Sequence, residues 1–343
     1  MEKIGILTGG GDCPGLNPVI RAVVRKGLNE GFAVVGIKNG WKGLIENDTF
    51  PLDLAAVSGI LPKGGTILGT SRTNPFKKEG DLQKLKENFK KLALYALIVV
   101  GGEDTLGAAS KLIKDGITTI VGVPKTIDND LSCTDYTFGF DTALNIATEC
   151  IDRLHTTAES HHRIIVVEVM GRHAGWIAIE SGIAGGADVI LIPEIPIDMD
   201  EVCDSIKKRH SRGKTFSIVV VAEGAQFKDK DLITKEERLD AFGHVRLGGI
   251  GDALAAEIEK RTGYETRVSV LGHIQRGGSP TAFDRVLGTR LGVKAVELVK
   301  GKKFGTMASL VGNKITDVPL EQAVSSLKTV DKEFYELAKV FFG

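Results

Sequence analysis

Residues 95–114, YALIVVGGEDTLGAASKLIK, run from an apolar stretch through two glycines into a segment whose apolar residues recur with helical spacing. An apolar run bounded by glycine is typical of a buried strand, and the segment after it is typical of an amphipathic helix. The same strand-to-helix order recurs along the chain. It predicts parallel sheets built from βαβ units, and therefore an α/β fold.

The other apolar runs and periodic segments extend this pattern over most of the sequence. Predicted strands span residues 4–8, 32–37, 95–100, 119–123, 164–169, 189–192, 216–222 and 267–271. Predicted helices span residues 16–30, 81–94, 105–114, 141–157, 199–210, 252–261 and 283–299.

The composition is that of an ordinary globular protein, with 42% hydrophobic and 26% charged residues among 343, which is long enough for two domains. Lys and Arg total 44 and Asp and Glu total 44, so a zero net charge gives no overall attraction to nucleic acid or to an anionic membrane. No apolar run reaches the roughly 20 residues of a membrane span. The start, MEKIGILTGG, lacks a signal-peptide pattern, and the four cysteines form no CxxC pair. We therefore expect reduced thiols and a cytoplasmic location.

Ligands of open α/β sheets bind beyond the carboxyl ends of the strands, so the loops that follow strands should hold the site. Six such loops are rich in glycine, acids, arginine and histidine. They read TGGGDCPGLN (8–17), GGEDT (101–105), PKTIDND (124–130), MGRHAGW (170–176), AEGA (222–225) and LGHIQRGGSP (271–280).

The first loop, TGGGDCPGLN, leads from a strand into a helix, where bare backbone N–H groups suit a phosphate. A tight glycine turn without a ligand is the alternative. The dinucleotide fingerprint GxGxxG fails because Pro14 occupies its third glycine position. The P-loop pattern also fails, since Ala108 and Ala109 stand where Lys and Ser or Thr are required. Both failures disfavour a dinucleotide oxidoreductase and a P-loop protein.

The third loop, PKTIDND, offers two carboxylates, Asp128 and Asp130, after a predicted strand. Phosphoryl transfer to a hydroxyl needs a carboxylate that takes the hydroxyl proton, together with cations around the moving group. Asp128 could be this base, Lys125 a positive clamp and Thr126 a hydroxyl donor. The alternative is a capped turn, because Asp and Asn also stabilise turns.

Basic side chains gather at both ends of the predicted strands in the second half of the chain. Arg172, His273 and Arg276 lie in loops after strands, whereas Arg163 and Arg267 open the strands that lead there. Guanidinium groups bind a phosphate dianion bidentately, so this set suits a sugar phosphate. Structural arginines that pair with surface acids are the alternative.

The histidines other than His273 show no metal-ligand spacing such as HExxH. We interpret them, His173 included, as surface or hydrogen-bonded polar residues.

Between residues 8 and 280 the sequence resembles the phosphofructokinase family. All six loops match in order and spacing, and VVEVMGRHAGW (166–176) and LGHIQRGGSP (271–280) are the most specific strings. The resemblance implies two Rossmann-like three-layer α/β domains with the active site in the cleft between them. It assigns residues 1–139 plus 252–303 to a larger domain that binds the donor and Mg²⁺. Residues 140–251 plus 304–343 would form a smaller domain that binds fructose 6-phosphate.

The resemblance also implies Mg²⁺-dependent phosphoryl transfer to O1 of fructose 6-phosphate, with Asp128 as proton acceptor. Positions that match the family's sugar-phosphate contacts are Thr126, Asp128, Arg163, Met170, Gly171, Arg172, Glu223, Arg267, His273 and Arg276, of which Thr126 and Arg172 also hold the transferring group. Positions that match its donor contacts are Gly11, Arg72, Gly102 and Lys125, with Glu103 as the Mg²⁺ ligand. In the family Arg163 and Arg267 reach into the site of a neighbouring subunit, which implies a homodimer or homotetramer.

The family contains ATP users and pyrophosphate users, and the ATP users carry glycine where this chain has Asp104 and Lys125. The chain therefore resembles the pyrophosphate-dependent type. A carboxylate at the place of the α-phosphate of ATP would repel it by ~4 kcal/mol at ~4 Å and an effective dielectric constant of ~20. Lys125 adds a positive charge that can stabilise the transition state. We predict reversible transfer from pyrophosphate to fructose 6-phosphate, giving fructose 1,6-bisphosphate and phosphate, in glycolysis or gluconeogenesis.

Two other readings of the same residues remain open. The first is an ATP-dependent or mixed-donor 6-phosphofructokinase, because only two positions distinguish the donors. The second is a sugar-phosphate sensor without catalysis, which would lack the base, whereas Asp128, Thr126 and Glu103 are all present.

Overall fold

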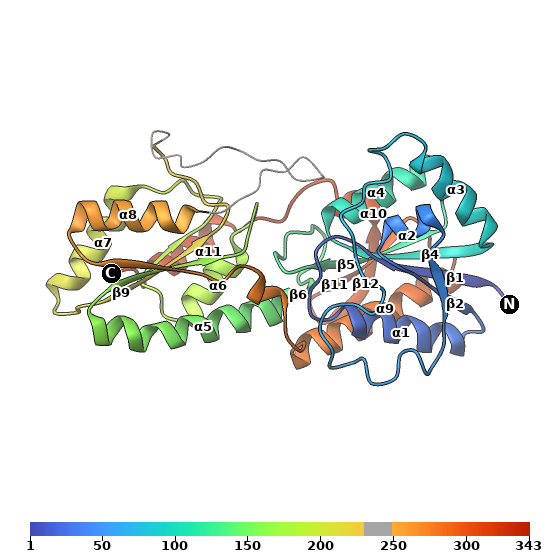
Figure 1. Cartoon of the computed structure of the whole chain (residues 1–343), viewed down its shortest axis with the longest axis horizontal. Coiled ribbons are helices and arrows are strands. Elements are labelled where there is room, and N and C mark those ends of the chain that lie inside the picture. Colours follow the sequence, from blue (N-terminus) through green and yellow to red (C-terminus); the bar gives the residue numbers. More distant parts are fainter. Residues whose placement is uncertain (230–248) are drawn as a thin grey trace.

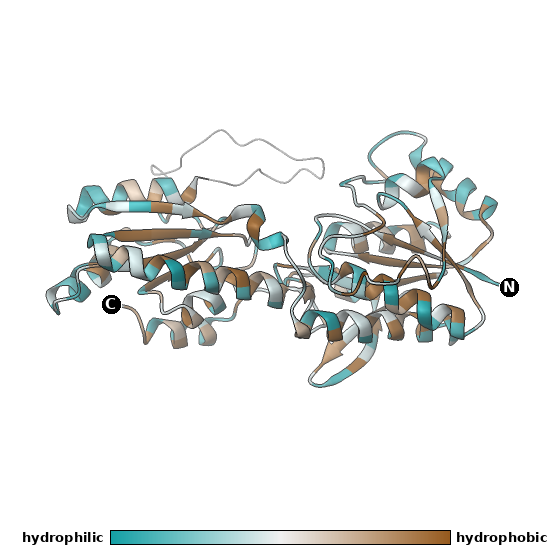
Figure 2. Ribbon diagram, turned by 60° about the horizontal axis from the view of Figure 1, so that its bottom comes forward, coloured by the Kyte–Doolittle hydropathy of each residue, from teal (hydrophilic) through white to brown (hydrophobic). Residues whose placement is uncertain are grey.

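The computed structural model describes residues 1–229 and 249–343, which form two layered α/β bodies side by side (Figure 1). We call them the larger and the smaller lobe. In each lobe the strands are apolar and lie between helices whose outer faces are polar (Figure 2). No helix among the described residues is long and apolar enough to cross a membrane.

The larger lobe is built on a sheet with the order β12-β11-β5-β4-β1-β2-β3 in the described residues, and β6 pairs with β5 at its end. Its strands are β1 (Lys3–Thr8), β2 (Ala33–Ile37), β3 (Thr49–Leu52), β4 (Leu94–Gly101), β5 (Ile120–Thr126), β6 (Phe138–Gly139), β11 (Thr306–Val311) and β12 (Lys314–Pro319). Its helices are α1 (Leu16–Asn29), α2 (Trp41–Glu46), α3 (Asp81–Lys91), α4 (Glu103–Lys114), α9 (Ala282–Lys300) and α10 (Leu320–Ala323). The β2–β3 and β11–β12 pairs are antiparallel and the other pairs are parallel.

Alternating side chains of β4 explain why this lobe has three layers. Ile98 and Val100 pack on one face of the sheet, in the cluster that contains α1 and α9. Leu97 and Val99 point to the other face, in the cluster that contains α3 and α4. A strand that is buried on both faces in this way must be covered by helices on both sides.

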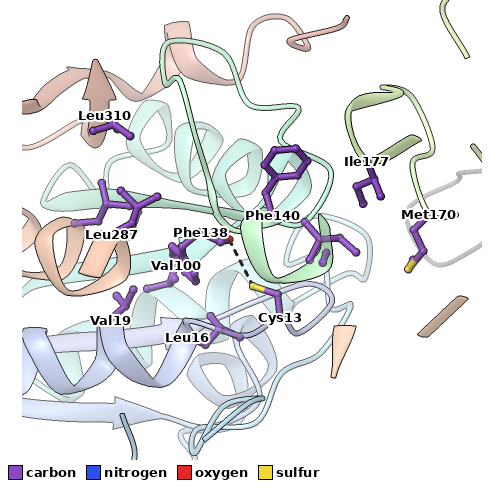
Figure 3. Packing of buried hydrophobic residues seen from close by; sticks show 14 of the residues in the cluster. Cys13, Leu16, Val19, Val100, Phe138, Phe140, Met170, Ile177, Leu287 and Leu310 are labelled. Atoms are coloured by element: carbon purple, nitrogen blue, oxygen red, sulfur yellow. Dashed lines mark hydrogen bonds between the residues drawn. The ribbon is translucent and has the colours of Figure 1, made fainter. Parts of the chain in front are cut away.

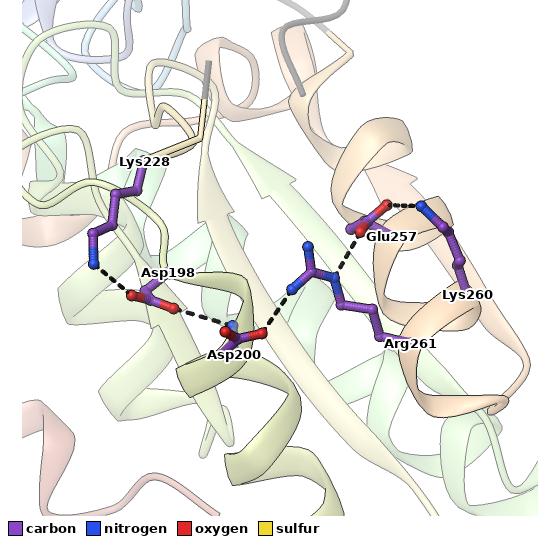
Figure 4. Close-up of polar contacts among 6 residues, drawn as sticks. All are labelled: Asp198, Asp200, Lys228, Glu257, Lys260 and Arg261. Carbon is purple, nitrogen blue, oxygen red and sulfur yellow. Dashed lines mark hydrogen bonds and ion pairs between the residues drawn. The ribbon is translucent and has the colours of Figure 1, made fainter. Parts of the chain in front are cut away.

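The smaller lobe has the parallel order β10-β7-β9-β8. Its strands are β7 (Ile164–Val169), β8 (Val189–Leu191), β9 (Ser217–Ala222) and β10 (Thr266–Val270), and the 3-10 helix η2 (Gly272–Arg276) follows β10. Its helices are α5 (Phe140–His161), α6 (Trp176–Ala184), α7 (Met199–Ser211), α8 (Ile250–Thr262) and α11 (Lys332–Lys339). Arg261 on α8 bridges to Asp200 on α7 at 2.8 Å, an exposed contact drawn in Figure 4 that adds little to stability.

Apolar packing continues from one lobe into the other. Phe138 and Phe140, on either side of the passage from β6 to α5, belong to the same cluster as Leu16 of α1 and Ile177 of α6 (Figure 3). Cys13 lies in this cluster with its Sγ 3.7 Å from the carbonyl oxygen of Phe138. The two lobes therefore share one core instead of being joined by a loose linker.

The predicted α/β class and all the predicted strands and helices are confirmed, with boundaries shifted by a few residues. The predicted division of the chain between the domains is wrong at two places. Residues 252–303 do not all belong to the larger lobe, because β10 pairs with β7. Residues 304–343 do not all belong to the smaller lobe, because β11 pairs with β5 and β12 with β11. An apolar run predicts a strand, but its pairing partner is decided by long-range contacts.

Among the described residues the chain passes between the lobes at three places, from β6 to α5, from η2 to α9 and from α10 to α11. The carboxylate of Asp284, which has 0% exposure, joins the first two passages. It accepts hydrogen bonds from the backbone N–H groups of Gly139 and Thr142 at 2.9 and 2.8 Å and from the Thr142 hydroxyl at 2.5 Å. One side chain thus fixes the first turn of α5 against that of α9.

We expect Asp284→Ala to lower the free energy of unfolding by at least about 3 kcal/mol. The substitution removes the carboxylate that accepts from three donors of Gly139 and Thr142, and each buried donor that loses its bond costs about 1–3 kcal/mol. Urea denaturation measures the loss. Asp331→Ala is the matched control, because Asp331 caps the exposed start of α11 and such a cap contributes about 1 kcal/mol. Equal losses in the two variants would contradict the expectation.

Candidate active site

A cavity of about 410 Å³ lies where the carboxyl ends of β1, β4 and β5 face those of β7 and β9 and the helix η2. Side chains and backbone from both lobes line it. The lining residues are Gly10, Gly11, Arg72, Gly102, Glu103, Asp104, Thr105, Lys125, Thr126, Asp128, Asp130, Met170, Arg172, His173, Glu223, His273 and Arg276.

The glycine loop after β1 forms one wall because no side chain fits there. A Cβ on Gly11 would lie 2.5 Å from Nη1 of Arg276, and Gly10 has a φ of +80° that favours glycine. Arg276 comes from the smaller lobe and donates to the carbonyl oxygen of Asp12 at 3.2 Å. The guanidinium therefore lies directly against the backbone of the larger lobe.

Glu103 and Asp104 occupy the first turn of α4, which begins at Glu103 after Gly102. This corrects the expectation that residues 101–105 form a loop and that the helix begins at Thr105. Carboxylates at a helix N-terminus are stabilised by the helix dipole, which makes this a favourable place for two acids.

Lys125 lies beneath the glycine loop and is 4% exposed. Its Nζ donates a hydrogen bond of 2.5 Å to the carbonyl oxygen of Gly11. Burial lowers the pKa of this ammonium group, while the nearby acids Asp12 and Asp128 oppose the shift. The side chain thus brings a buried positive charge to the floor of the cavity.

Asp128 projects from the turn after β5 with its Oδ1 buried and without a hydrogen-bond partner among the described residues. Burial raises the pKa of Asp128, and the charges of Arg276, Arg172 and Lys125 oppose that shift. The next residue, Asn129, has a φ of +52°. This left-handed residue turns the chain sharply between Asp128 and Asp130.

Two further acids of the cavity have pKa values far above their usual range. Burial, followed by the charge of Asp128, raises the pKa of Asp130 to about 7. The same two causes, in the same order, raise the pKa of Glu223 to about 7. Several largely buried carboxyl groups in one cavity perturb each other in this way, and such clusters concentrate at functional sites.

The smaller lobe supplies its residues through two loops that are tied together. The Met170 N–H donates to Oε1 of Gln275 at 2.8 Å, which joins the end of β7 to η2 between His273 and Arg276. Gly171 has a φ of +136°, and a Cβ there would lie 2.8 Å from the carbonyl oxygen of Ala174. This turn therefore requires glycine, and it carries Arg172 into the cavity.

The cavity contains thirteen of the sixteen residues that the sequence predicts for the site. Gly171 lies in the turn beside it. Arg163 and Arg267 are at the amino ends of β7 and β10, the opposite end of the sheet from the cavity, where both contact Glu265. His173 is exposed, in agreement with its interpretation as a surface residue, and it also lines the cavity. Its position directly after Arg172 in a strand-end loop brings it there.

Another cavity, of about 430 Å³, adjoins the first. Asn74, Gly107, Ser110, Lys111, Lys114, Glu321 and Ser325 are among its lining residues. Glu103 and Asp104 line both cavities. The two carboxylates at the start of α4 therefore stand at the boundary between them.

The family model described as Phosphofructokinase matches residues 3–299, and the chain belongs to the phosphofructokinase family. Within that family, the Pyrophosphate--fructose 6-phosphate 1-phosphotransferase of Streptomyces coelicolor is 60% identical over 342 residues, 99% of this chain and 100% of that protein. The ATP-dependent 6-phosphofructokinase of Mycobacterium leprae is 52% identical over 343 residues, 99% of this chain and 100% of that protein. The crystal structure of Pichia pastoris phosphofructokinase in the T-state has a TM-score of 0.82 at 35% identity, over 99% of this chain and 38% of that longer chain. The predicted family and fold are confirmed.

Proposed function

We propose that this protein transfers a phosphoryl group reversibly from pyrophosphate to O1 of fructose 6-phosphate, giving fructose 1,6-bisphosphate and phosphate. The observation that carries the proposal is the half-buried Asp128, whose Oδ1 is buried without a hydrogen-bond partner among the described residues and which lines the same cavity as Lys125, Arg172 and Arg276. The 60% identical relative, which is named for this reaction, supports it.

On the acceptor side, Asp128 takes the proton from the attacking hydroxyl group. A positioned base of this kind contributes roughly 10²- to 10⁴-fold to the rate. Its raised pKa makes it a stronger base than an ordinary aspartate. His273 and Arg276 of the smaller lobe bind the 6-phosphate of the sugar. The sugar itself is held by Met170, Gly171 and Glu223. Thr126 and Arg172 contact the phosphoryl group that is transferred.

On the donor side, the backbone around Gly11 and Gly102 binds the pyrophosphate oxygens together with Arg72. Lys125 stabilises negative charge on the transferred group, because a fixed cation in a buried site costs no reorganisation during the reaction. Its hydrogen bond to Gly11 holds the ammonium group at that place.

The carboxylates of the cavity fit Mg²⁺, which is held through one or two carboxylates together with substrate phosphates. Glu103 would bind the ion, and the unpartnered oxygen of Asp128 lies in the same cavity, as does Asp130, whose raised pKa the bound cation would lower again. The described residues contain no group of three or more acids, histidines or cysteines arranged to hold a metal by themselves, so the phosphates must complete the coordination. When bound, Mg²⁺ neutralises charge on those phosphates.

Asp104 selects the donor through its place at the boundary of the two cavities. A donor that extends beyond two phosphates toward the second cavity must pass this carboxylate, which repels a third phosphate by ~4 kcal/mol at ~4 Å in an effective dielectric constant of ~20. Pyrophosphate has only two phosphates, so it does not extend as far as the carboxylate of Asp104.

The second candidate is an ATP-dependent or mixed-donor 6-phosphofructokinase. The cavity beyond Asp104 has a volume of about 430 Å³, which is room for a nucleoside, and this favours it. Steady-state turnover of fructose 6-phosphate with pyrophosphate and with ATP, each with Mg²⁺, decides between the two. A larger kcat/KM with ATP would reject the leading proposal.

The active protein is a homo-oligomer, either a homodimer or a homotetramer. Arg163 and Arg267 lie at the amino ends of their strands, away from the cavity of their own chain. They would serve the sugar phosphate of a neighbouring chain. A cytoplasmic location remains a prediction from the sequence.

We expect two inactive variants to restore each other in a mixture. One chain carries Asp128→Asn and the other Arg163→Ala with Arg267→Ala. A mixed dimer contains one site with its own Asp128 and both arginines from its neighbour, so refolding the variants together should recover up to about a quarter of wild-type activity for a dimer with random pairing. Each variant refolded alone is the control. No recovery in hybrids that have been isolated would contradict the exchange of arginines between chains.

A further inference from the structure

The loop that carries Asp128 has a strained backbone and needs contacts from outside to hold it. Asn129 and Cys133 have φ values of +52° and +62°, in the left-handed region that side chains disfavour. Such conformations persist only where the surrounding structure fixes them. The contacts around residues 128–135 therefore decide where the carboxylate of Asp128 points.

The third passage between the lobes supplies several of these contacts. Leu327 forms an antiparallel bridge with Leu131, and the Ser132 hydroxyl donates to the carbonyl oxygen of Ser326 at 2.7 Å. The next residue of this passage, Lys328, donates hydrogen bonds to the loop from its backbone and from its side chain.

Lys328 contacts the loop through both its backbone and its side chain. Its backbone N–H donates to the carbonyl oxygen of Asp130 at 2.8 Å. Its Nζ donates to the carbonyl oxygens of Thr134 and Asp135 at 3.0 and 2.7 Å. These three bonds hold both ends of the strained turn that follows Asp128.

The same residue also holds the smaller lobe. The indole N–H of Trp176 donates to the carbonyl oxygen of Lys328 at 2.9 Å, and the ammonium group of Lys328 lies 5.4 Å from the centre of that ring. Trp176 is the first residue of α6 and directly follows the loop that carries Arg172 and His173. One lysine therefore touches the Asp128 loop of the larger lobe and the Arg172 loop of the smaller lobe.

We propose that Lys328 is a positioning residue for phosphoryl transfer. It fixes the Asp128 loop against the Arg172 loop, so that the carboxylate of Asp128 and the guanidinium of Arg172 can contact the same bound substrate. This rests on the proposed function. Lys328 lines neither cavity described above, so it acts through the two loops and not on the substrate. A displacement of about 1 Å of a catalytic group can cost about 10²-fold in rate.

Lys328→Met tests this role, because methionine keeps much of the apolar stem and removes the ammonium group. We expect kcat to fall about 10- to 100-fold, with the KM values for both substrates changed less than about 3-fold, since the substrate-binding cations stay in place. Lys328→Arg, which keeps a charged donor, should recover most of kcat. Lys332→Met, at an exposed lysine of the same C-terminal part, is the matched control and should keep wild-type kcat.

Hydrogen exchange gives a readout that does not depend on turnover. Peptides that cover residues 127–136 should exchange faster in Lys328→Met than in wild type, while peptides of β4 should not. A residue with a merely structural role would lower the melting temperature and leave kcat per folded molecule unchanged, and that result would overturn the proposal.

Trp176→Phe provides a second variant in case Lys328→Met does not fold. It keeps an aromatic ring and removes the five-membered part of the indole with the N–H that reaches the Lys328 carbonyl oxygen, and we expect kcat to fall about 3- to 10-fold with KM retained. Unchanged kcat and unchanged exchange in this variant would also overturn the proposal. If the wild-type protein turns over neither donor, the proposed function is rejected, and the exchange comparison alone decides whether Lys328 holds the loop.

Discussion

Asp128→Asn should lower kcat between about 10²- and 10⁴-fold and change the KM for fructose 6-phosphate only a few-fold. Asparagine has nearly the same shape, so it leaves the cavity intact, but its amide cannot accept the proton of the attacking hydroxyl group. A loss confined to kcat marks an interaction that acts in the transition state. Steady-state kinetics with pyrophosphate, Mg²⁺ and varied fructose 6-phosphate measures both constants.

The reverse reaction provides a sharp check on this assignment. A base that removes a proton in one direction returns it in the other, so turnover of fructose 1,6-bisphosphate with phosphate should fall by the same factor. Asp152→Asn, at an exposed position of α5, is the control and should behave as wild type. Full activity of Asp128→Asn in either direction would remove Asp128 from the catalytic role.

The double variant Asp104→Gly, Lys125→Gly should lose pyrophosphate-dependent turnover by about 10²- to 10³-fold. Lys125 supplies a buried positive charge beside the glycine loop, and loss of one preorganised group at a transferring charge typically costs that much. The substitutions at positions 104 and 125 have different expected effects. Removal of Lys125 weakens catalysis with pyrophosphate, whereas removal of Asp104 lifts the repulsion against a longer donor.

Single variants separate these effects. Asp104→Asn removes the charge and keeps the size of the side chain, whereas Asp104→Gly removes both. If kcat/KM for ATP rises equally in the two variants, the charge of Asp104 excludes ATP. If it rises only in the glycine variant, the volume of the side chain excludes ATP. Lys125→Met should account for most of the loss with pyrophosphate. Unchanged pyrophosphate turnover in the double variant would contradict both roles.

Much of the site could be predicted from the sequence because parallel strands gather their carboxyl-end loops at one edge of a sheet. That rule brings Gly11, Glu103 and Asp128 together although they are far apart in the chain. Local patterns could not predict which sheet takes β10 or β11, because both are apolar runs and their partners lie more than a hundred residues away. Short elements such as β3 and α2 also give too few residues for a periodic signal.

Lys328 shows a different limit of prediction from sequence. It lies in SSLKTVDK, a polar segment without strand or helix periodicity. Its ammonium group donates to the backbone carbonyl oxygens of residues 134 and 135. Every residue has such an oxygen, so the sequence does not indicate this contact. A contact of this kind becomes visible only when the backbone path is known.

The order of strands along the chain has a consequence for synthesis on the ribosome. Domains near the amino terminus generally fold first, yet the larger lobe, which begins at β1, cannot be completed first. Its helix α9 and its strands β11 and β12 follow β10, the last strand of the smaller sheet. While the nascent chain emerges, the smaller sheet has all its strands when the larger one still lacks Leu287 and Leu291 of α9 to cover β5. The larger lobe, whose synthesis begins first, therefore keeps one apolar face of its sheet uncovered until most of the chain has been synthesised.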